Sequence, residues 1–599
     1  MSTSPNRWAP IELPRPQSAW VRSLVDRPLR MVEHLFGLDE IDRMTREVEF
    51  GDASVPYMRR VLAATRTEPR ADPTEVTRVP AKGSTLVVCN HPLGGADSIA
   101  LLALMLERRP DTRILANSML ACFPFARESM ILVDPFGGRG AARRNAAAIR
   151  QAIEWLREGH LLIAFPAGEV SAVHWGKWSP CDPPWSTIPA RMAIAAGASI
   201  VPAWCEGTNR PIFHAAGLVH PRLRTALLPN EFLARRGTPV EFRFGRPMRA
   251  SESAGLDAEG LTRLMRGRSE LLRKSEVVAR PSNDVAQAPI APMAATADQF
   301  AAEFAALPKE DLLFSEGAYA VYATKAVRVP KAMHEIGRLR EIAFRAVGEG
   351  SGKPCDTDRF DETYTQIIVW NKDAREIVGG YRAGPVSEVT RDVGIDGLYT
   401  STLFDFSPRI VSELSNAVEL GRSFVRVEYQ RQPLPLSLLW KGIGVFMFTR
   451  GYQQMFGPVS ISNDYTSMSK ELIMEFLERH RLAKPFAPLV RPKHPPERRP
   501  IESWSDTERT LATADLTNVD RLVDEIERGK RAIPVLLRQY LRLNARLLAF
   551  NVDEDFGDVV DALMIVDLLQ IDERIVRYYI GDEGPAMLRA RLNTSTTAS

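Results

Sequence analysis

The sequence predicts an α/β protein with two globular halves. From residue 84, short apolar runs alternate with helical stretches, a pattern typical of strands and helices in an α/β layer architecture. A second alternation begins near residue 309, and an Ala- and Pro-rich stretch without hydrophobic period separates the two. A length of 599 residues is sufficient for two large domains or three ordinary ones.

Residues 1–80 precede the first alternation, and we expect them to form a helical lead. Apolar residues between Trp20 and Phe36 fall at helical spacing, and arginines and acids in nearly equal number lie between them. Such a segment either packs as an ordinary helix or lies in a membrane interface through its apolar face. The sequence leaves both alternatives open.

The first α/β domain is expected over residues 81–275. Its strands are predicted from STLVVCN, TRILAN, SMILVD, HLLIAF, SIVPAW and PVEFRFG, and its helices from SIALLALMLERR, AARRNAAAIRQAIEWLREG, ARMAIAAG and residues 257–274. Residues 276–308 are predicted as the Ala/Pro linker.

The second α/β domain is expected over residues 309–599. An amphipathic helix, KAMHEIGRLREIAFRAVG, precedes strands predicted from QIIVWN, EIVGGYRAG and ELGRSFVRV, and the apolar run LSLLWKGIGVFMFTRGY follows. The tail contains IPVLLRQYLRLNARLLAF and DVVDALMIVDLLQI, which are apolar at close to helical period. We therefore expect a helical C-terminal extension.

Composition argues against several classes of protein. The 77 Lys and Arg residues against 74 Asp and Glu give a formal charge of +3, so no nucleic-acid partner is expected. Uninterrupted apolar stretches are too short for a membrane-spanning helix, and the start lacks the basic and apolar segments of an export signal. Five cysteines without a C-x-x-C pair favour neither a disulfide framework nor a metal site. These features favour the cytoplasm.

A first candidate site follows the strand TLVVC. His91 lies at the strand end in a Gly-rich turn, and Asp97 comes six positions later at a helix start. In a His-Asp pair the carboxylate accepts from one ring nitrogen and leaves the other basic, which suits a general base acting on a hydroxyl. There is no G-x-S-x-G serine, so a covalent acyl-enzyme is not expected. The alternative interpretation makes His91 a turn residue and Asp97 a helix N-cap.

Asn90, His91 and Asp97 resemble the first motif of the glycerolipid (lysophospholipid) acyltransferase family, in which Asn-His is followed by Asp. FPAGEVS, beginning at Phe165, resembles a later Phe-Pro-x-Gly motif, and VP at 201–202 resembles a closing element. The resemblance covers about residues 80–250. It implies O-acyl transfer, and its candidate residues are His91 and Asp97 for catalysis and Asn90, Gly168 and Glu169 for substrate binding.

The chain departs from this family at two points. The Asn-His-to-Asp spacer is five residues rather than four. Ala167 stands where the family has Glu, and the arginine that usually follows is absent. Because such basic groups hold glycerol phosphate, the departure implies an acceptor without that phosphate.

A second candidate site is carried by RLREIAFR at 338–345, DRFD at 358–361, GGYR at 379–382 and ELGR at 419–422. Taken singly, these charges suit surface salt bridges. Their order resembles the acyl-homoserine-lactone synthases and the ornithine N-acyltransferases of the GNAT superfamily. The matching residues are Arg340 with Phe344, Asp358 with Asp361, Arg382, and Glu419 with Arg422.

This second resemblance implies N-acyl transfer to an amino acid. Acids hold and deprotonate an α-ammonium, and an arginine fork binds an α-carboxylate. Glu419 is the candidate catalytic residue, and the candidates for substrate binding are Arg340, Asp358, Asp361, Arg382 and Arg422.

The acyl donor is suggested by the stretch after EYQ. RQPLPLSLLW has prolines where the GNAT pyrophosphate loop has glycines, and proline lacks the N–H that binds CoA. Relatives with this altered loop use acyl carrier protein, so the resemblance implies acyl carrier protein as partner and donor, with acyl-CoA as the alternative. No bound cofactor is expected.

The two-domain order resembles the bifunctional enzymes of bacterial ornithine-lipid synthesis. It implies that the second half N-acylates ornithine with a 3-hydroxyacyl group and that the first half O-acylates the resulting lyso-lipid. Two alternatives remain: the same steps on glycine or another amino acid, or a lysophospholipid acyltransferase with a non-catalytic acyl-binding GNAT-like half. Water-soluble donors and an oily product imply a cytoplasmic enzyme, peripheral on the inner face of the cell membrane.

Overall fold

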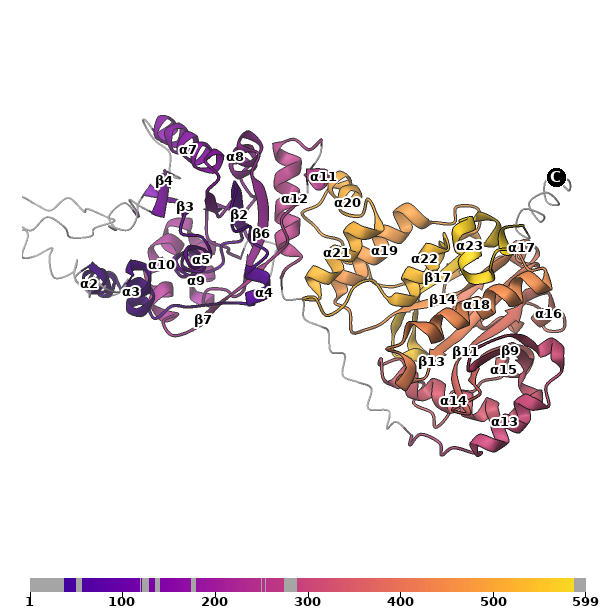
Figure 1. Ribbon diagram of the computed structural model, residues 1–599. Coiled ribbons are helices and arrows are strands. Elements are labelled where there is room, and N and C mark those ends of the chain that lie inside the picture. Colours follow the sequence, from indigo (N-terminus) through magenta and orange to yellow (C-terminus); the bar gives the residue numbers. More distant parts are fainter. Residues whose placement is uncertain are drawn as a thin grey trace, which may run out of the picture. The chain divides into compact units, whose positions relative to one another are not determined.

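The computed structural model describes residues 37–49, 56–118, 120, 129–134, 141–173, 179–248, 250–253, 255–273 and 288–586. They form two compact units of mixed α and β structure, so the predicted α/β class is confirmed (Figure 1). The N-terminal unit comprises Met1–Lys274 with Ile501–Ala512, and the C-terminal unit comprises Ser275–Pro500 with Thr513–Ser599. The helix predicted between Trp20 and Phe36 lies outside the described residues.

The N-terminal unit is built on a seven-stranded sheet of order β1-β7-β6-β2-β5-β3-β4 among the described residues. All neighbouring strands are parallel except β6 and β7. Every residue of β2 is buried, which indicates that both faces of the sheet are covered. The strands are β1 (Glu68–Ala71), β2 (Thr85–Cys89), β3 (Thr112–Asn117), β4 (Met130–Val133), β5 (Leu161–Ala164), β6 (Ser199–Cys205) and β7 (Pro239–Phe244).

Helix α5 packs against β1, β3 and β7, whereas α12 packs against α8, β2 and β6 (Figure 1).

The predicted helical lead, residues 1–80, is not wholly helical, because β1 within it is a strand that pairs with β7. The helices are α2 (Leu38–Glu49), α3 (Tyr57–Thr65), α4 (Pro73–Val76), α5 (Gly95–Arg108), α7 (Ala141–Arg157), α8 (Ile188–Ala196), α9 (Pro211–Val219), α10 (Pro221–Ala234), α11 (Ala250–Ser253), α12 (Ala258–Glu270) and α20 (Asp506–Ala512).

A short segment from late in the chain completes the N-terminal unit. Trp504 is buried against α12, where a Cβ on Gly267 would lie 1.7 Å from its Nε1 atom. Arg263 forms an ion pair of 3.1 Å with Glu508 of α20. Glycine at 267 is therefore required by close packing, and the N-terminal unit is not a continuous stretch of sequence.

The C-terminal unit is built on an eight-stranded sheet of order β16-β17-β14-β13-β11-β10-β9-β8, as far as the chain is described. Its strands are antiparallel except for the pair β13 and β14. The strands are β8 (Leu312–Glu316), β9 (Tyr319–Lys325), β10 (Thr365–Asn371), β11 (Glu376–Pro385), β13 (Ala417–Val425), β14 (Gln454–Ile461), β16 (Arg546–Asp553) and β17 (Val559–Asp567); β12 (Phe404–Phe406) and β15 (Val490–Pro492) form a separate pair.

The helices of this unit cover both faces of the sheet. Tyr381 of β11 faces Trp440 of α18, with ring centroids 6.2 Å apart, and the next residue, Arg382, points to the other face. The α-helices are α13 (Ala297–Ala305), α14 (Pro330–Arg345), α15 (Phe360–Thr363), α16 (Val386–Val389), α17 (Pro408–Glu413), α18 (Pro433–Arg450), α19 (Ser467–Arg481), α21 (Leu516–Ile526), α22 (Val535–Arg542) and α23 (Glu573–Ile580).

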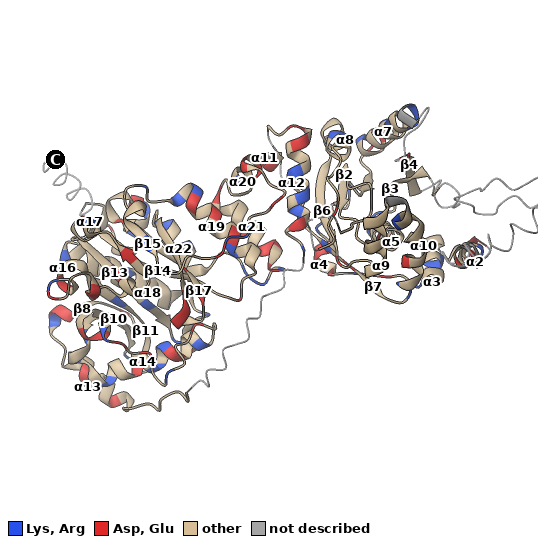
Figure 2. Cartoon of the chain, turned by 180° about the vertical axis from the view of Figure 1, so that it is seen from behind, with Lys and Arg blue, Asp and Glu red and all other residues tan. Residues whose placement is uncertain are grey.

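The shorter 3-10 helices are η2 (Lys309–Asp311), η3 (Ala326–Arg328), η4 (Gly394–Gly397), η5 (Tyr399–Thr402), η6 (Val427–Tyr429), η7 (Ala487–Leu489), η8 (Glu554–Phe556) and η9 (Leu568–Gln570). The ribbon of both units carries basic and acidic positions interspersed along its helices (Figure 2). No helix in the described part of the chain combines the length and hydrophobicity needed to cross a membrane.

Two local predictions need correction. The stretch predicted as linker contains α13, which begins with a capping box at Thr296 and buries Phe300 and Phe304 in the core of the C-terminal unit. The C-terminal extension is not wholly helical, because LLAF and VVDALMIVD lie in β16 and β17. Buried strands produce nearly continuous apolar runs, so their periodicity does not distinguish them from helices.

Candidate active sites

His91 of the N-terminal unit lies two residues after the end of β2, and Asp97 lies in the first turn of α5. His91 Nδ1 is 3.0 Å from Oδ1 of Asp97, which is 0% exposed. Burial lowers the pKa of His91, but the charge of Asp97 and its hydrogen bond, together with the charge of Asp182, outweigh this effect and raise it. The structure therefore brings the predicted pair together and leaves Nε2 to accept a proton.

Backbone and side-chain contacts hold this pair in place. The Leu93 N–H donates to Asp97 Oδ2 at 2.8 Å. The Asn90 side chain donates to the Cys205 carbonyl at 2.9 Å and accepts from the Cys205 N–H at 2.6 Å, so it joins the ends of β2 and β6. Asn90, predicted to bind substrate, is engaged in holding the strand ends beside His91.

Asp182 is a neighbour of His91 that no sequence motif indicated. Its Oδ1 accepts from the His91 N–H at 3.3 Å and from the Ser171 hydroxyl, and its Oδ2 accepts from Trp185 Nε1 at 2.9 Å. Ser171 N–H in turn donates to the His91 carbonyl at 2.8 Å. This network fixes the backbone at His91, which sequence spacing alone did not predict because Asp182 is 91 positions away.

The FPAG motif contributes an aromatic wall. The Phe165 ring lies 4.4 Å from the His91 ring between centroids. Gly168 has φ of +67° and donates its N–H to the Phe165 carbonyl at 3.0 Å, so it closes a tight turn for which glycine is suited. The Glu169 side chain is 64% exposed and pairs with Arg224 of α10 at 2.6 Å.

A thiol nucleophile is disfavoured beside His91. Burial is the main cause that raises the pKa of the Cys89 thiol well above its ordinary value, and nearby carboxylates add to the effect. The reactive thiolate is therefore strongly disfavoured. The pair of His91 and Asp97 suits direct transfer to a hydroxyl rather than a covalent enzyme intermediate.

The predicted residues of the second site converge on one face of the C-terminal sheet. Arg340 is 1% exposed and donates to Asp361 Oδ1 at 2.9 Å and to Gln366 Oε1 at 2.8 Å. Arg382 is 0% exposed and donates to Asp358 Oδ1 at 2.5 Å. Burial raises the pKa of Asp361, but Arg340 and Arg382 more than offset this and lower it.

Arg422 continues this network at a bulge of β13. Its backbone has φ of +52°, and its Nε lies 3.2 Å from Asp356 Oδ2. Its Nη2 lies 3.6 Å from Asp358, and its Nη1 donates to the Tyr399 hydroxyl at 3.3 Å. Asp356 was missed by the sequence interpretation, although it lies two positions before the predicted Asp-x-x-Asp pair.

Glu419 is buried and heavily hydrogen bonded. Its Oε1 accepts from the Thr400 N–H at 2.7 Å, and its Oε2 accepts from the Tyr399 N–H at 2.9 Å and from the Tyr364 hydroxyl. These contacts hold helix η5 against the sheet. The environment favours a positioning carboxylate, whereas the sequence predicted a catalytic one.

The sheet splits beside Glu419. β13 and β14 pair only over Ala417–Glu419 and Gln454–Phe456, after which β13 continues beside β11 and β14 beside β17. A Cβ on Gly421 would meet no atom within 4 Å. Open space therefore adjoins the predicted charged residues where the two strands diverge.

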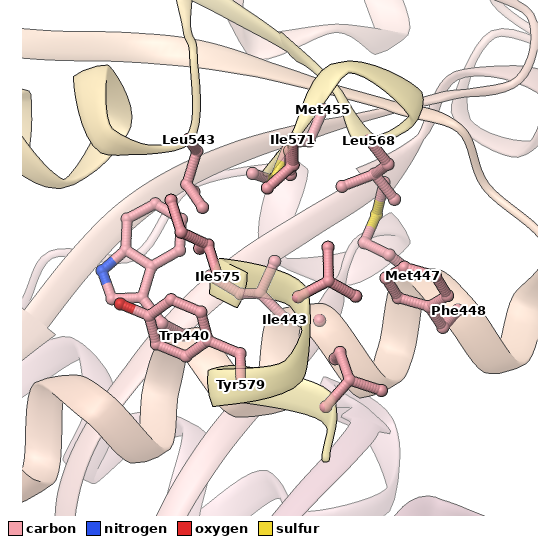
Figure 3. Close-up of a pocket in the computed structure, with 13 residues that line it drawn as sticks. Trp440, Ile443, Met447, Phe448, Met455, Leu543, Leu568, Ile571, Ile575 and Tyr579 are labelled. Atoms are coloured by element: carbon pink, nitrogen blue, oxygen red, sulfur yellow. The ribbon is translucent and has the colours of Figure 1, made fainter. Parts of the chain in front are cut away.

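An apolar pocket with a cavity volume of about 30 Å³ lies on the α18 side of the sheet. Figure 3 shows Ile443, Met447 and Phe448 of α18 facing Ile575 and Tyr579 of α23. Met455 also lines the pocket; the residue after it, Phe456, pairs with Glu419, so the pocket and the Glu419 side chain lie on opposite faces.

Both units resemble known acyltransferases. Residues 53–286 match a family described as acyltransferase, and residues 339–441 match the acetyltransferase (GNAT) domain. A glycine N(alpha)-acyltransferase from Bacteroides thetaiotaomicron is 34% identical over 278 residues, covering 43% of this chain and 80% of that protein. The chain belongs to the GNAT-type N(alpha)-acyltransferase family. It is an acyltransferase that carries a second acyltransferase domain.

Other relatives carry similar names. A glycine N(alpha)-acyltransferase from Phocaeicola vulgatus is 34% identical, covering 41% of this chain and 79% of that protein. An L-ornithine N(alpha)-acyltransferase from Agrobacterium fabrum is 23% identical, covering 45% of this chain and 89% of that protein. A solved CoA-dependent acyl-homoserine lactone synthase shares 18% identity over 23% of this chain and 66% of its own, at a TM-score of 0.17, which is too low to support a shared fold.

Proposed function

We propose that this acyltransferase makes a doubly acylated amino-acid lipid in two steps. The C-terminal unit transfers a 3-hydroxyacyl group to the α-amine of an amino acid, and the N-terminal unit acylates the 3-hydroxyl of that product. The observation that carries the proposal is Arg382, a wholly buried arginine whose Nε and Nη2 have no acceptor among the described residues. An amino-acid carboxylate would satisfy such donors.

Two acceptors are favoured by the named relatives. The two glycine enzymes are 34% identical to this chain, whereas the three ornithine enzymes are 23–25% identical. Glycine is therefore the first candidate and ornithine, the acceptor expected from sequence, is the second. The same α-ammonium and α-carboxylate chemistry serves both.

Acyl carrier protein is the proposed donor. In the GNAT arrangement a pyrophosphate binds to free N–H groups at a helix start, but Pro433 and Pro435 occupy the first turn of α18. Two of the donors that would contact CoA are thus missing.

In the second step His91 acts as general base. Its Nε2 takes the proton of the 3-hydroxyl while the oxygen attacks a second acyl thioester; the C–O bond forms, the C–S bond breaks, and the departing thiolate recovers the proton. Asp97 stabilises the imidazolium. Carrying both steps on one chain raises the local concentration of the intermediate, and its lipid character places the enzyme on the cytoplasmic surface of the membrane.

Lipid mass spectrometry tests the proposal in a host that lacks amino-acid lipids. The chain is expected to produce the doubly acylated lipid, His91→Ala only the singly acylated one, and Glu419→Ala neither. His160→Ala is the control, because His160 forms a similar pair with Asp111, 3.1 Å apart, outside the candidate site. An unchanged doubly acylated lipid from His91→Ala would show the N-terminal assignment to be wrong.

A further inference from the structure

Asp561 is a carboxylate in the apolar strand β17 that the proposed mechanism has not used. It is buried, and its Oδ1 accepts from the Ser460 hydroxyl of β14 at 2.8 Å. Its neighbours along the strand are apolar, in the sequence VVDALMIVD. It lies outside both regions that match the acyltransferase and GNAT families, residues 53–286 and 339–441.

The surroundings of Asp561 are short of positive charge. Burial is the main cause that raises its pKa to about 8, and the charges of Asp553 and Glu349 add to it, whereas Ser460 and Arg422 lower it. Burial likewise raises the pKa of Asp553, and that of Glu349 to about 7. A buried carboxylate beside two other acids destabilises the fold when it is ionised. A cation that binds next to it would therefore be stabilised.

Asp561 shares a face of the sheet with the amino-acid site. Ser460, its partner across the ladder, is four residues after Phe456, and Phe456 pairs with Glu419. Residues an even number apart in a strand point to the same face. The Tyr399 hydroxyl lies 3.3 Å from both Arg422 Nη1 of the amino-acid site and Oδ2 of Asp553, the acid whose charge acts on Asp561.

A second observation indicates that a ligand with one negative and one positive group fits between Arg382 and these acids. Arg382 contacts the Tyr399 ring, with its guanidinium 5.2 Å from the ring centroid, and keeps two buried donors without an acceptor among the described residues. Those donors suit a carboxylate, and the acids beyond Tyr399 suit an ammonium.

We propose that Asp561 is the catalytic base of N-acylation and takes the proton from the α-ammonium of the amino-acid acceptor. This inference rests on the proposed function. One ammonium proton moves to the Asp561 carboxylate; the free amine then attacks the thioester carbonyl, the C–N bond forms, the C–S bond breaks, and the thiolate takes up the second proton lost by nitrogen. Glu419 has the separate task of holding η5, since the N–H groups of Tyr399 and Thr400 already occupy its oxygens.

The pH dependence of N-acylation tests this assignment, with glycine and ornithine as acceptors and a 3-hydroxyacyl thioester of acyl carrier protein as donor. A base must be ionised, so kcat/KM is expected to rise with pH through the pKa of Asp561. Ser460→Ala removes a hydrogen bond that lowers this pKa and should move the rising limb to higher pH. Asp553→Asn removes a neighbouring charge that raises it and should move the limb to lower pH.

Asp561→Asn should reduce kcat by about 100-fold or more, the usual contribution of a general base. Its stability provides a second measurement. Because the pKa of Asp561 is raised in the fold, its contribution to stability is present at acid pH and is lost as pH rises toward about 8. The melting temperature of Asp561→Asn should therefore fall less between pH 5 and pH 9 than that of the unaltered chain. Asp567→Asn on the same strand, where the carboxylate caps Leu569, is the control and should stay within about twofold in kcat.

Suppose that Asp561→Asn loses activity but the rising limb of the kcat/KM pH profile stays in place in both Ser460→Ala and Asp553→Asn. That result would overturn the assignment and leave Asp561 a structural residue. An unaltered chain that acylates neither glycine nor ornithine would instead refute the proposed function, and this inference with it.

Discussion

The two candidate sites use charge in opposite ways. In the N-terminal unit a single His-Asp pair lies beside a wall formed by Phe165, and His91 remains partly accessible. In the C-terminal unit three arginines interlock with three aspartates in the interior, and each predicted binding residue also holds a neighbour. The charged side chains of the first site contribute little to the stability of their unit, whereas those of the second site also stabilise the fold around them. Substitutions should therefore affect chemistry in one unit and both chemistry and stability in the other.

Arg340→Met gives the largest expected effect on stability. Removing Arg340 leaves Asp361 buried with Arg382 3.5 Å away as its remaining ion-pair partner. Breaking a buried ion pair typically costs about 3–5 kcal/mol. Arg382 compensates the charge of Asp361 only in part, because it also pairs with Asp358 at 2.5 Å. Urea unfolding of the C-terminal unit should show this loss as a lower midpoint with an unchanged slope.

Arg409→Met is the matched control. Arg409 forms an exposed pair with Glu413 at 3.8 Å, with side chains 76% and 47% exposed. Such pairs contribute about 0–1 kcal/mol. If Arg340→Met were no more destabilising than Arg409→Met, the buried charges would not depend on one another and the contrast between the two units would fail.

Asp97→Asn tests the other side of the comparison. Asparagine keeps an oxygen for the Leu93 N–H, but it removes the charge that raises the pKa of His91. We expect kcat for O-acylation to fall on the order of 100-fold and the rising limb of its pH profile to move to lower pH, with the unfolding midpoint nearly unchanged. Enzyme assays on the lyso-lipid measure the first two quantities. A large loss of stability without a shift of the limb would make Asp97 a purely structural residue.

The sequence predicted the strand-helix alternation because its periodicities are local. It could not identify β17, because that strand is buried at every position but its last and so loses the alternation that marks a strand. It could not identify β16, because every third residue of that strand is exposed or half-buried, which is close to a helical period. It also missed the docking of Trp504 on Gly267, because that contact joins residues more than 200 positions apart and leaves no local pattern.

The candidate sites, like the fold, were predicted only where the signal is local in the sequence. A motif with fixed spacing placed His91 with Asp97. The order of the second set of motifs assigned Arg340 and Asp361 to one site, but only the structure shows that they pair with each other. Asp182 and Asp561 carry no motif and reach their neighbours only through the tertiary fold. A physical signal for Asp561 was nevertheless present, since an isolated acid in an apolar strand is costly unless it is paired or functional.

Glu169→Gln carries the smallest expected effect. The FPAG resemblance predicted Glu169 as a substrate-binding residue, but its side chain is 64% exposed and is already paired with Arg224. Solvent screens the largely exposed Glu169 carboxylate, and surface ion pairs contribute about 0–1 kcal/mol, so Glu169→Gln should change stability by less than about 1 kcal/mol and the KM for the lyso-lipid by less than about threefold. Glu158→Gln, at an exposed acid beside His160, is the control. A tenfold rise in KM confined to Glu169→Gln would mean that the lyso-lipid displaces Arg224 on binding, and the N-terminal site would then share with the C-terminal one the use of paired charges for recognition.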